Sequence, residues 1–104
     1  MIHLTAQTPV MIHTDPADFR RGIDGFVALC RDVLVQDPRC GTRFVFINRA
    51  RTMVRVLTYD EGGFWLMTKR LSKGRFHAWP REAEGFDAVA LRRLLNNLSL
   101  PQAA

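Results

Sequence analysis

The sequence lacks the features of secreted, membrane and metal-binding proteins. Its two cysteines, Cys30 and Cys40, form no paired spacing with each other or with the three isolated histidines, whereas a structural zinc site needs four ligands in close pairs. No apolar run approaches the roughly 18 residues of a membrane span, and no basic segment precedes an apolar block at the N-terminus. We therefore predict a soluble cytoplasmic protein without metal or cofactor, with Cys30 buried in a helix and Cys40 in a turn.

Catalytic motifs are also missing. Four acidic residues that could hold a nuclease metal, Asp18, Asp24, Asp60 and Glu61, come from distant segments and follow no metal-binding pattern. No nucleophile motif of the GxSxG type is present, and no lysine follows the glycines of "GIDGF" as a phosphate-binding loop requires. We predict that the protein is not an enzyme, and a metal-dependent nuclease is the weaker alternative.

The chain has the size and composition of one globular domain. It contains 104 residues, of which 47% are hydrophobic and 24% charged, so it is too apolar to be disordered and too short for two cores. We predict a single domain over residues 1–104, with 1–8 and 99–104 as flexible tails.

The middle of the sequence has the pattern of an antiparallel meander. Short runs rich in Phe, Val, Ile, Leu and Trp alternate with the turn-like segments "NRART", "DEGG" and "SKG". We predict strands at 43–48, 53–59 and 63–70, a further strand at 75–79, and a short strand in "PVMIHT" (9–14). The run "FVFI" is apolar throughout, which is typical of a strand covered on both faces.

Two segments have helical periodicity. Apolar residues recur at helical spacing from Ile23 to Leu34, and the pattern stops by Asp37 and Pro38; the start lies near 16 or near 22. A second helix is predicted near 87–97. The fold class is therefore α+β, a mostly antiparallel sheet of four or five strands in the order β-α-β-β-β(-β)-α, packed against two helices that cover one face.

The net charge of +5 is concentrated in the middle third. Residues 43–75 contain eight basic residues against two acidic residues, a local charge of +6, whereas 1–42 carry −1 and 76–104 carry 0. A field concentrated in one segment is typical of a surface that binds polyanions.

The meander should unite two basic turns. Alternate turns lie at the same end of a meander, so the turns at 48–52 and 71–75 should be neighbours, with "DEGG" at the opposite end. This geometry favours a polyanion site over solvated loops that only protect a sheet edge. Loops reach phosphates more readily than base edges, so sequence preference should be weak. The predicted nucleic-acid-binding residues are Arg49, Arg51, Arg55, Lys69, Arg70, Lys73 and Arg75.

A family resemblance covers most of residues 9–80. The blocks that carry it are "DFRRGIDGF" (18–26), "DPRCG" (37–41), "FVFINRAR" (44–51), "VRVLTYDEGGFWLMTKRLSKGRF" (54–76) and "WP" (79–80). In order and spacing they resemble TnpB, the small accessory transposition protein encoded by the second open reading frame of bacterial insertion sequences of the insertion sequence 66 family. The spacing between Phe76 and Trp79 is one residue longer than the family pattern.

The resemblance implies a protein that assists a separate transposase in moving DNA and has no established catalytic activity of its own. Two functional classes follow: a DNA-binding accessory factor that acts through the basic turns, or an adaptor that docks on the transposase without touching DNA. An exposed edge strand can also support a homodimer.

A second charged cluster surrounds the predicted start of the first helix. Opposite charges so close together favour either an internal network of ion pairs and caps or a docking site for a partner protein. The residues of this cluster are Asp18, Arg20, Arg21 and Asp24.

Overall fold

The computed structural model describes residues 4–98, in which one four-stranded sheet packs against two helices. The predicted α+β class is confirmed. The predicted tail at 99–104 and the first three residues of the tail at 1–8 lie outside the described residues. In chain order, the elements are β1 (Val10–Ile12), α1 (Ile23–Asp32), β2 (Arg43–Ile47), β3 (Met53–Asp60), β4 (Gly63–Arg70) and α2 (Ala88–Leu95).

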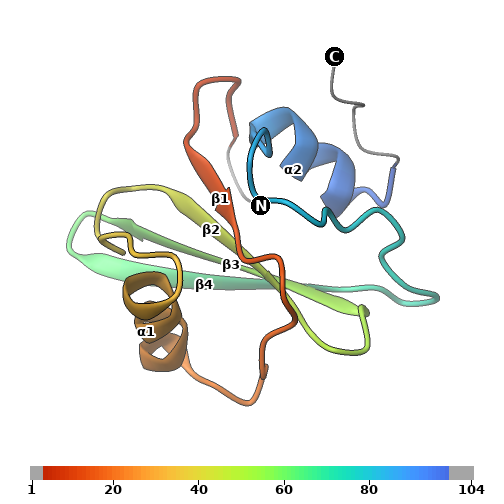
Figure 1. The fold of residues 1–104 in the computed structure, drawn as a ribbon, viewed down its shortest axis with the longest axis horizontal. Coiled ribbons are helices and arrows are strands. Elements are labelled where there is room, and N and C mark those ends of the chain that lie inside the picture. Colours follow the sequence, from red (N-terminus) through yellow and green to blue (C-terminus); the bar gives the residue numbers. More distant parts are fainter. Residues whose placement is uncertain (1–3, 99–104) are drawn as a thin grey trace.

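The sheet follows the order β1-β2-β3-β4 (Figure 1). β2, β3 and β4 form the predicted antiparallel meander, and β1 adds to β2 in parallel. The β3–β4 hairpin closes tightly because Glu61 and Gly62 both adopt left-handed backbone angles, with φ of 43° and 89°. That pair of angles is typical of the type I′ turns whose twist matches the flanking strands.

The two helices cover opposite faces of the sheet, so the prediction that they share one face is wrong (Figure 1). Side chains alternate along β2: Phe44 and Phe46 pack against α1, whereas Val45 and Ile47 pack on the α2 side. A strand that is apolar at every position needs a cover on each face, as the run "FVFI" indicates. Neither described helix is long and apolar enough to cross a membrane.

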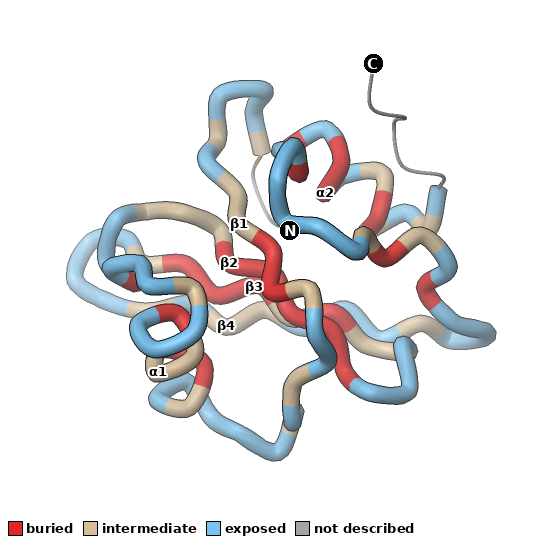
Figure 2. The backbone as a smooth tube through the Cα atoms, viewed as in Figure 1, coloured by how far each residue is buried: buried red, intermediate tan, exposed pale blue. Residues whose placement is uncertain are grey.

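Buried residues concentrate in the central strands (Figure 2). One hydrophobic cluster lies on the α1 side of the sheet and includes Phe26, Cys30 and Leu57. Burial raises the pKa of the Cys30 thiol to about 12, so this thiol stays protonated and packs as a small apolar group. Cys30 is therefore the buried helix residue that its spacing predicts, and Cys40 is exposed.

The segment between β4 and α2 does not form the strand predicted at 75–79. The Phe76 N–H donates to the carbonyl of Arg51, in the turn before β3. The segment instead crosses the α2 face and buries Phe76, Trp79 and Phe86 in the second cluster. The Trp79 indole nitrogen donates a hydrogen bond to the carbonyl of Thr14 at 2.8 Å. The apolar residues of this stretch therefore fill the core on the α2 face and do not form a strand.

Helix α1 begins at Ile23 with Gly22 as its N-cap, the later of the two predicted starts. Gly25 allows a close approach: a Cβ atom there would lie 2.7 Å from the Cβ of Arg21. Nothing lies within 4 Å of a Cβ atom placed on Gly22, so only one of the two glycines is required by packing.

Helix α1 ends in a strained turn, which gives a stability prediction. Val35 has a φ of 53° and is 78% exposed, and a β-branched residue is disfavoured in this region. Val35→Gly should therefore raise the free energy of unfolding by about 1 kcal/mol, measured by urea denaturation. The control is Val33→Gly at a helical, 56% exposed position, where glycine should lower stability by about 0.5–1 kcal/mol. The same sign at both positions would contradict this reading.

Candidate nucleic-acid interface

The turn between β2 and β3 is shaped by one buried amide. The Asn48 side-chain oxygen accepts hydrogen bonds from the backbone N–H groups of Thr52 (2.9 Å) and Met53 (3.0 Å). Its side-chain nitrogen donates to the Thr52 hydroxyl at 3.0 Å. A buried amide that makes all these bonds fixes the turn, and the turn holds Arg49 and Arg51 in exposed positions.

The second basic loop is attached to this turn by backbone hydrogen bonds. The Leu71 N–H donates to the carbonyl of Thr52 at 3.0 Å, and the Phe76 N–H donates to the carbonyl of Arg51 at 2.8 Å. Lys73 and Arg75 lie in the exposed loop between these two contacts. The prediction that the two basic turns are neighbours is confirmed (Figure 1).

Helix α2 holds the same loop from its C-terminal end. Asn97 adopts a left-handed φ of 55° just after the helix, and its N–H and that of Leu98 donate to carbonyls of the last turn, a Schellman-type cap. Its side chain accepts from the His77 N–H at 3.2 Å and donates to the carbonyl of Arg75 at 3.1 Å. Sequence reasoning missed this role, although an asparagine after a leucine-rich helix is a signal for such a cap.

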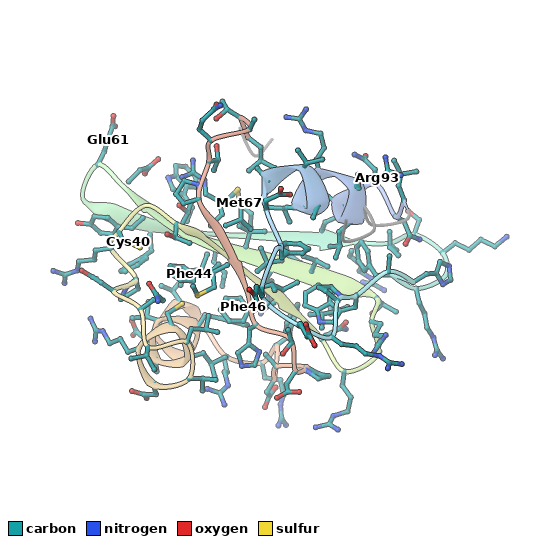
Figure 3. All side chains as sticks on the ribbon, turned by 45° about the horizontal axis from the view of Figure 1, so that its top comes forward. Cys40, Phe44, Phe46, Glu61, Met67 and Arg93 are labelled. Carbon is teal, nitrogen blue, oxygen red and sulfur yellow. The ribbon has the colours of Figure 1, made fainter. Side chains whose placement is uncertain are left out.

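We call the exposed cations gathered here the basic end. No carboxylate of residues 4–98 lies within ion-pair distance of any of them. The acidic turn, Asp60 and Glu61, lies at the other end of the β3–β4 hairpin, where Glu61 projects from the tip (Figure 3). The basic end comprises Arg49, Arg51, Arg70, Lys73 and Arg75.

Arg55 belongs to the predicted set but is engaged elsewhere. Its Nε donates to the Thr68 hydroxyl at 2.9 Å, and its Nη1 donates to the carbonyl of Phe19 at 2.6 Å. Its guanidinium also lies 4.7 Å from the centre of the Phe19 ring, within cation–π range. Arg55 therefore fastens the segment before α1 to the sheet.

Lys69 also differs from the exposed loop cation that the sequence predicts. Residues of β4 alternate between the two faces, and Lys69 lies on the α2 face opposite Val54. Its ammonium donates to the carbonyl of Leu95 at 2.5 Å, at the end of α2. A cation at a helix C-terminus interacts favourably with the helix dipole, so Lys69 joins α2 to the sheet.

The acidic and basic cluster before α1 contains an internal ion pair. Arg20 donates to both oxygens of the Asp18 carboxylate, with the shortest contact at 2.8 Å. These hydrogen bonds hold the pKa of Asp18 well below its usual range. Arg21 and Asp24 are exposed outside this pair. The cluster borders a shallow hollow of about 330 Å³ lined by residues 16–20 and 48–50, so it adjoins the first basic turn.

The contacts of Arg55 can be tested with a substitution that leaves the net charge of the protein unchanged. Lysine cannot bridge both partners or stack on a ring as guanidinium does, so Arg55→Lys should lower the free energy of unfolding by about 1–2 kcal/mol. Arg70→Lys, the same change at an exposed position of the neighbouring strand, should shift it by less than about 0.5 kcal/mol. Urea denaturation of both variants measures the difference. Equal losses would show that Arg55 has no special structural role.

Comparison with known proteins gives relatives along most of the chain. The protein-family model described as "IS66 Orf2 like protein" matches residues 8–103. Two similar proteins come from Sinorhizobium fredii, and both are described as uncharacterized. The protein y4jC is 43% identical over 67 residues, covering 64% of this chain and 57% of y4jC. The protein y4hO is 36% identical over 90 residues, covering 86% of this chain and 77% of y4hO.

The match to y4jC thus spans little more than half the length of that relative. No solved structure matches. The family model, by contrast, extends from before β1 to beyond α2 and includes both basic turns. The chain belongs to the IS66 Orf2-like family of insertion-sequence accessory proteins.

Proposed function

We propose that this family member assists transposition by binding the phosphate backbone of DNA through the basic end. The observation that carries the proposal is the convergence of five exposed cations from the β2–β3 turn, the end of β4 and the following loop, at an end of the sheet away from Asp60 and Glu61. Such a field attracts polyanions at long range. We place this DNA binding in the bacterial cytoplasm, where the DNA and the transposase are present.

The shape of the basic end favours phosphate contacts over base readout. Its cations lie on short loops and at the end of β4, and neither described helix contributes a residue to it for insertion into a groove. Trp79 is buried and bonded to Thr14, so it does not offer a stacking surface for bases. We therefore propose weak sequence preference and a strong dependence on salt concentration.

The transposase is the second proposed partner. A small non-catalytic protein can hold DNA for an enzyme that it also touches, and the Asp18–Arg20 cluster adjoins the basic end through the hollow beside Arg49. The alternative function, an adaptor that docks on the transposase without DNA contact, would use this cluster: Asp18, Arg20, Arg21 and Asp24. The exposure of the cluster favours it as the docking surface in either case.

A matched pair of double variants tests the DNA proposal. With four or five phosphate contacts, the slope of log K against log salt for duplex DNA should be about −4 to −5. Arg49→Gln with Arg51→Gln should reduce its magnitude by about 2 and weaken binding to every duplex equally. Fluorescence anisotropy with a labelled duplex of about 20 base pairs, between about 50 and 200 mM salt, measures both quantities.

The control removes two cations elsewhere. Arg31 and Arg39 are exposed in and after α1, toward the opposite end of the sheet. Arg31→Gln with Arg39→Gln lowers the net charge equally and should leave the slope nearly unchanged. Equal slopes for the two double variants would refute a localised site. Absence of DNA binding, with capture of the transposase retained, would favour the adaptor.

A further inference from the structure

β4 is an edge strand whose outer backbone is open. Among the described residues, β4 pairs only with β3. A two-residue loop joins Asp60 and Gly63, which makes them a hydrogen-bonded pair. The N–H of Leu71, eight residues after Gly63, donates to the carbonyl of Thr52. The odd-numbered residues of β4 therefore direct their backbone N–H and C=O groups toward β3. The N–H and C=O groups at the alternate positions therefore point away from β3. These positions are Phe64, Leu66, Thr68 and Arg70.

The first part of β4 is apolar on both faces of the sheet, over residues 64–67. Phe64 and Leu66 join the cluster under α1, whereas Met67 joins the cluster under α2, and Trp65 on the α2 face is 58% exposed. Edge strands that face water usually carry a charge, a proline or a bulge that blocks further pairing. The charges of β4 are confined to its end, at Lys69 and Arg70, and residues 63–68 carry none of these features, so this part of the strand is suited to a neighbour on its outer side.

The α2 face of the sheet is also incompletely covered beside β4. A groove of about 660 Å³ lies there, with Val54, Val56 and Met67 among its lining residues and Lys69 and Arg92 as its charged ones. Figure 3 shows Met67 between the sheet and α2. A strand added outside β4 would extend the apolar floor of this groove and cover Trp65.

We propose that the occupant of this edge is β4 of a second copy, paired antiparallel about a two-fold axis near Trp65 and Leu66. Charge complementarity selects this occupant. The strand begins next to the acidic turn and ends in Lys69 and Arg70, so antiparallel pairing places the acidic turn of each copy beside Lys69 and Arg70 of the other copy. Because the axis is two-fold, this contact between opposite charges occurs twice in the dimer. Parallel pairing would instead place like charges together.

The resulting dimer has one continuous eight-stranded sheet, with the two β2–β3 turns directed to opposite ends. Arg49, Arg51, Lys73 and Arg75 remain outside the contact in each copy. Only the consequence for DNA rests on the proposed function: such a dimer presents two phosphate-binding surfaces and can hold two duplex segments. The pairing itself needs no DNA and is tested without it.

Sedimentation equilibrium of the purified chain tests the dimer. One eight-residue edge is a small interface, so the mass should rise from 11.9 kDa toward twice that value as the concentration increases through about 1–200 µM. Glu61→Lys and Arg70→Glu should each weaken self-association about tenfold or more, because each places like charges across the two-fold axis. Mixing the two variants should restore association, because each then meets an opposite charge.

Controls with the same charge changes are Glu84→Lys and Arg81→Glu, at exposed positions outside the sheet. They should leave association within about twofold of the original chain. Hydrogen exchange supplies a readout at the backbone: the amides of Phe64, Leu66 and Thr68 should become protected as concentration rises. A monomer throughout the range would overturn the proposal. So would a dimer whose β4 amides stay unprotected, or a mixture of variants that associates no better than either alone.

Discussion

The attachment of the loop after β4 to the turn before β3 is the constraint on which the rest of the structure depends. Two backbone hydrogen bonds, from Leu71 to Thr52 and from Phe76 to Arg51, turn two separate basic loops into one surface. They also direct Phe76 and Trp79 into the core on the α2 face. Asn97 completes the attachment from the helix side. The same contacts therefore close the hydrophobic core and gather the positive charge.

Much of this arrangement follows from local sequence signals. The alternation of apolar runs with "NRART" and "DEGG" predicts the meander because strand pairs joined by short turns must be antiparallel. Meander geometry then predicts that the turns near Arg49 and Lys73 are neighbours. The charge distribution adds a candidate surface, since the eight basic residues of 43–75 have only Asp60 and Glu61 against them and these occupy the opposite turn.

Other features depend on contacts between distant segments, and sequence patterns do not encode them directly. Periodicity shows that each helix has an apolar side but does not say which face of the sheet it covers. Arg55 and Lys69 look like members of a basic surface because their charge is visible in the sequence, whereas their partners at Phe19 and Leu95 are 36 and 26 residues away. The apolar content of 75–79 suggested a strand, whereas Phe76 and Trp79 pack into the core on the α2 face. The charge distribution in the sequence indicates the basic end, but only the tertiary contacts show that Arg55 and Lys69 are engaged elsewhere.

The central claim is that both basic loops form one DNA-binding surface. The most direct test is a titration of the isotope-labelled protein with a short duplex, followed by amide chemical shifts in NMR spectra. We predict that the amide signals of residues 49–51 and 72–75 shift together along one binding curve, whereas the amide signals of residues 31–39 and 60–63 keep their positions. Shifts centred on the acidic turn, or two loops that titrate with different affinities, would contradict the account.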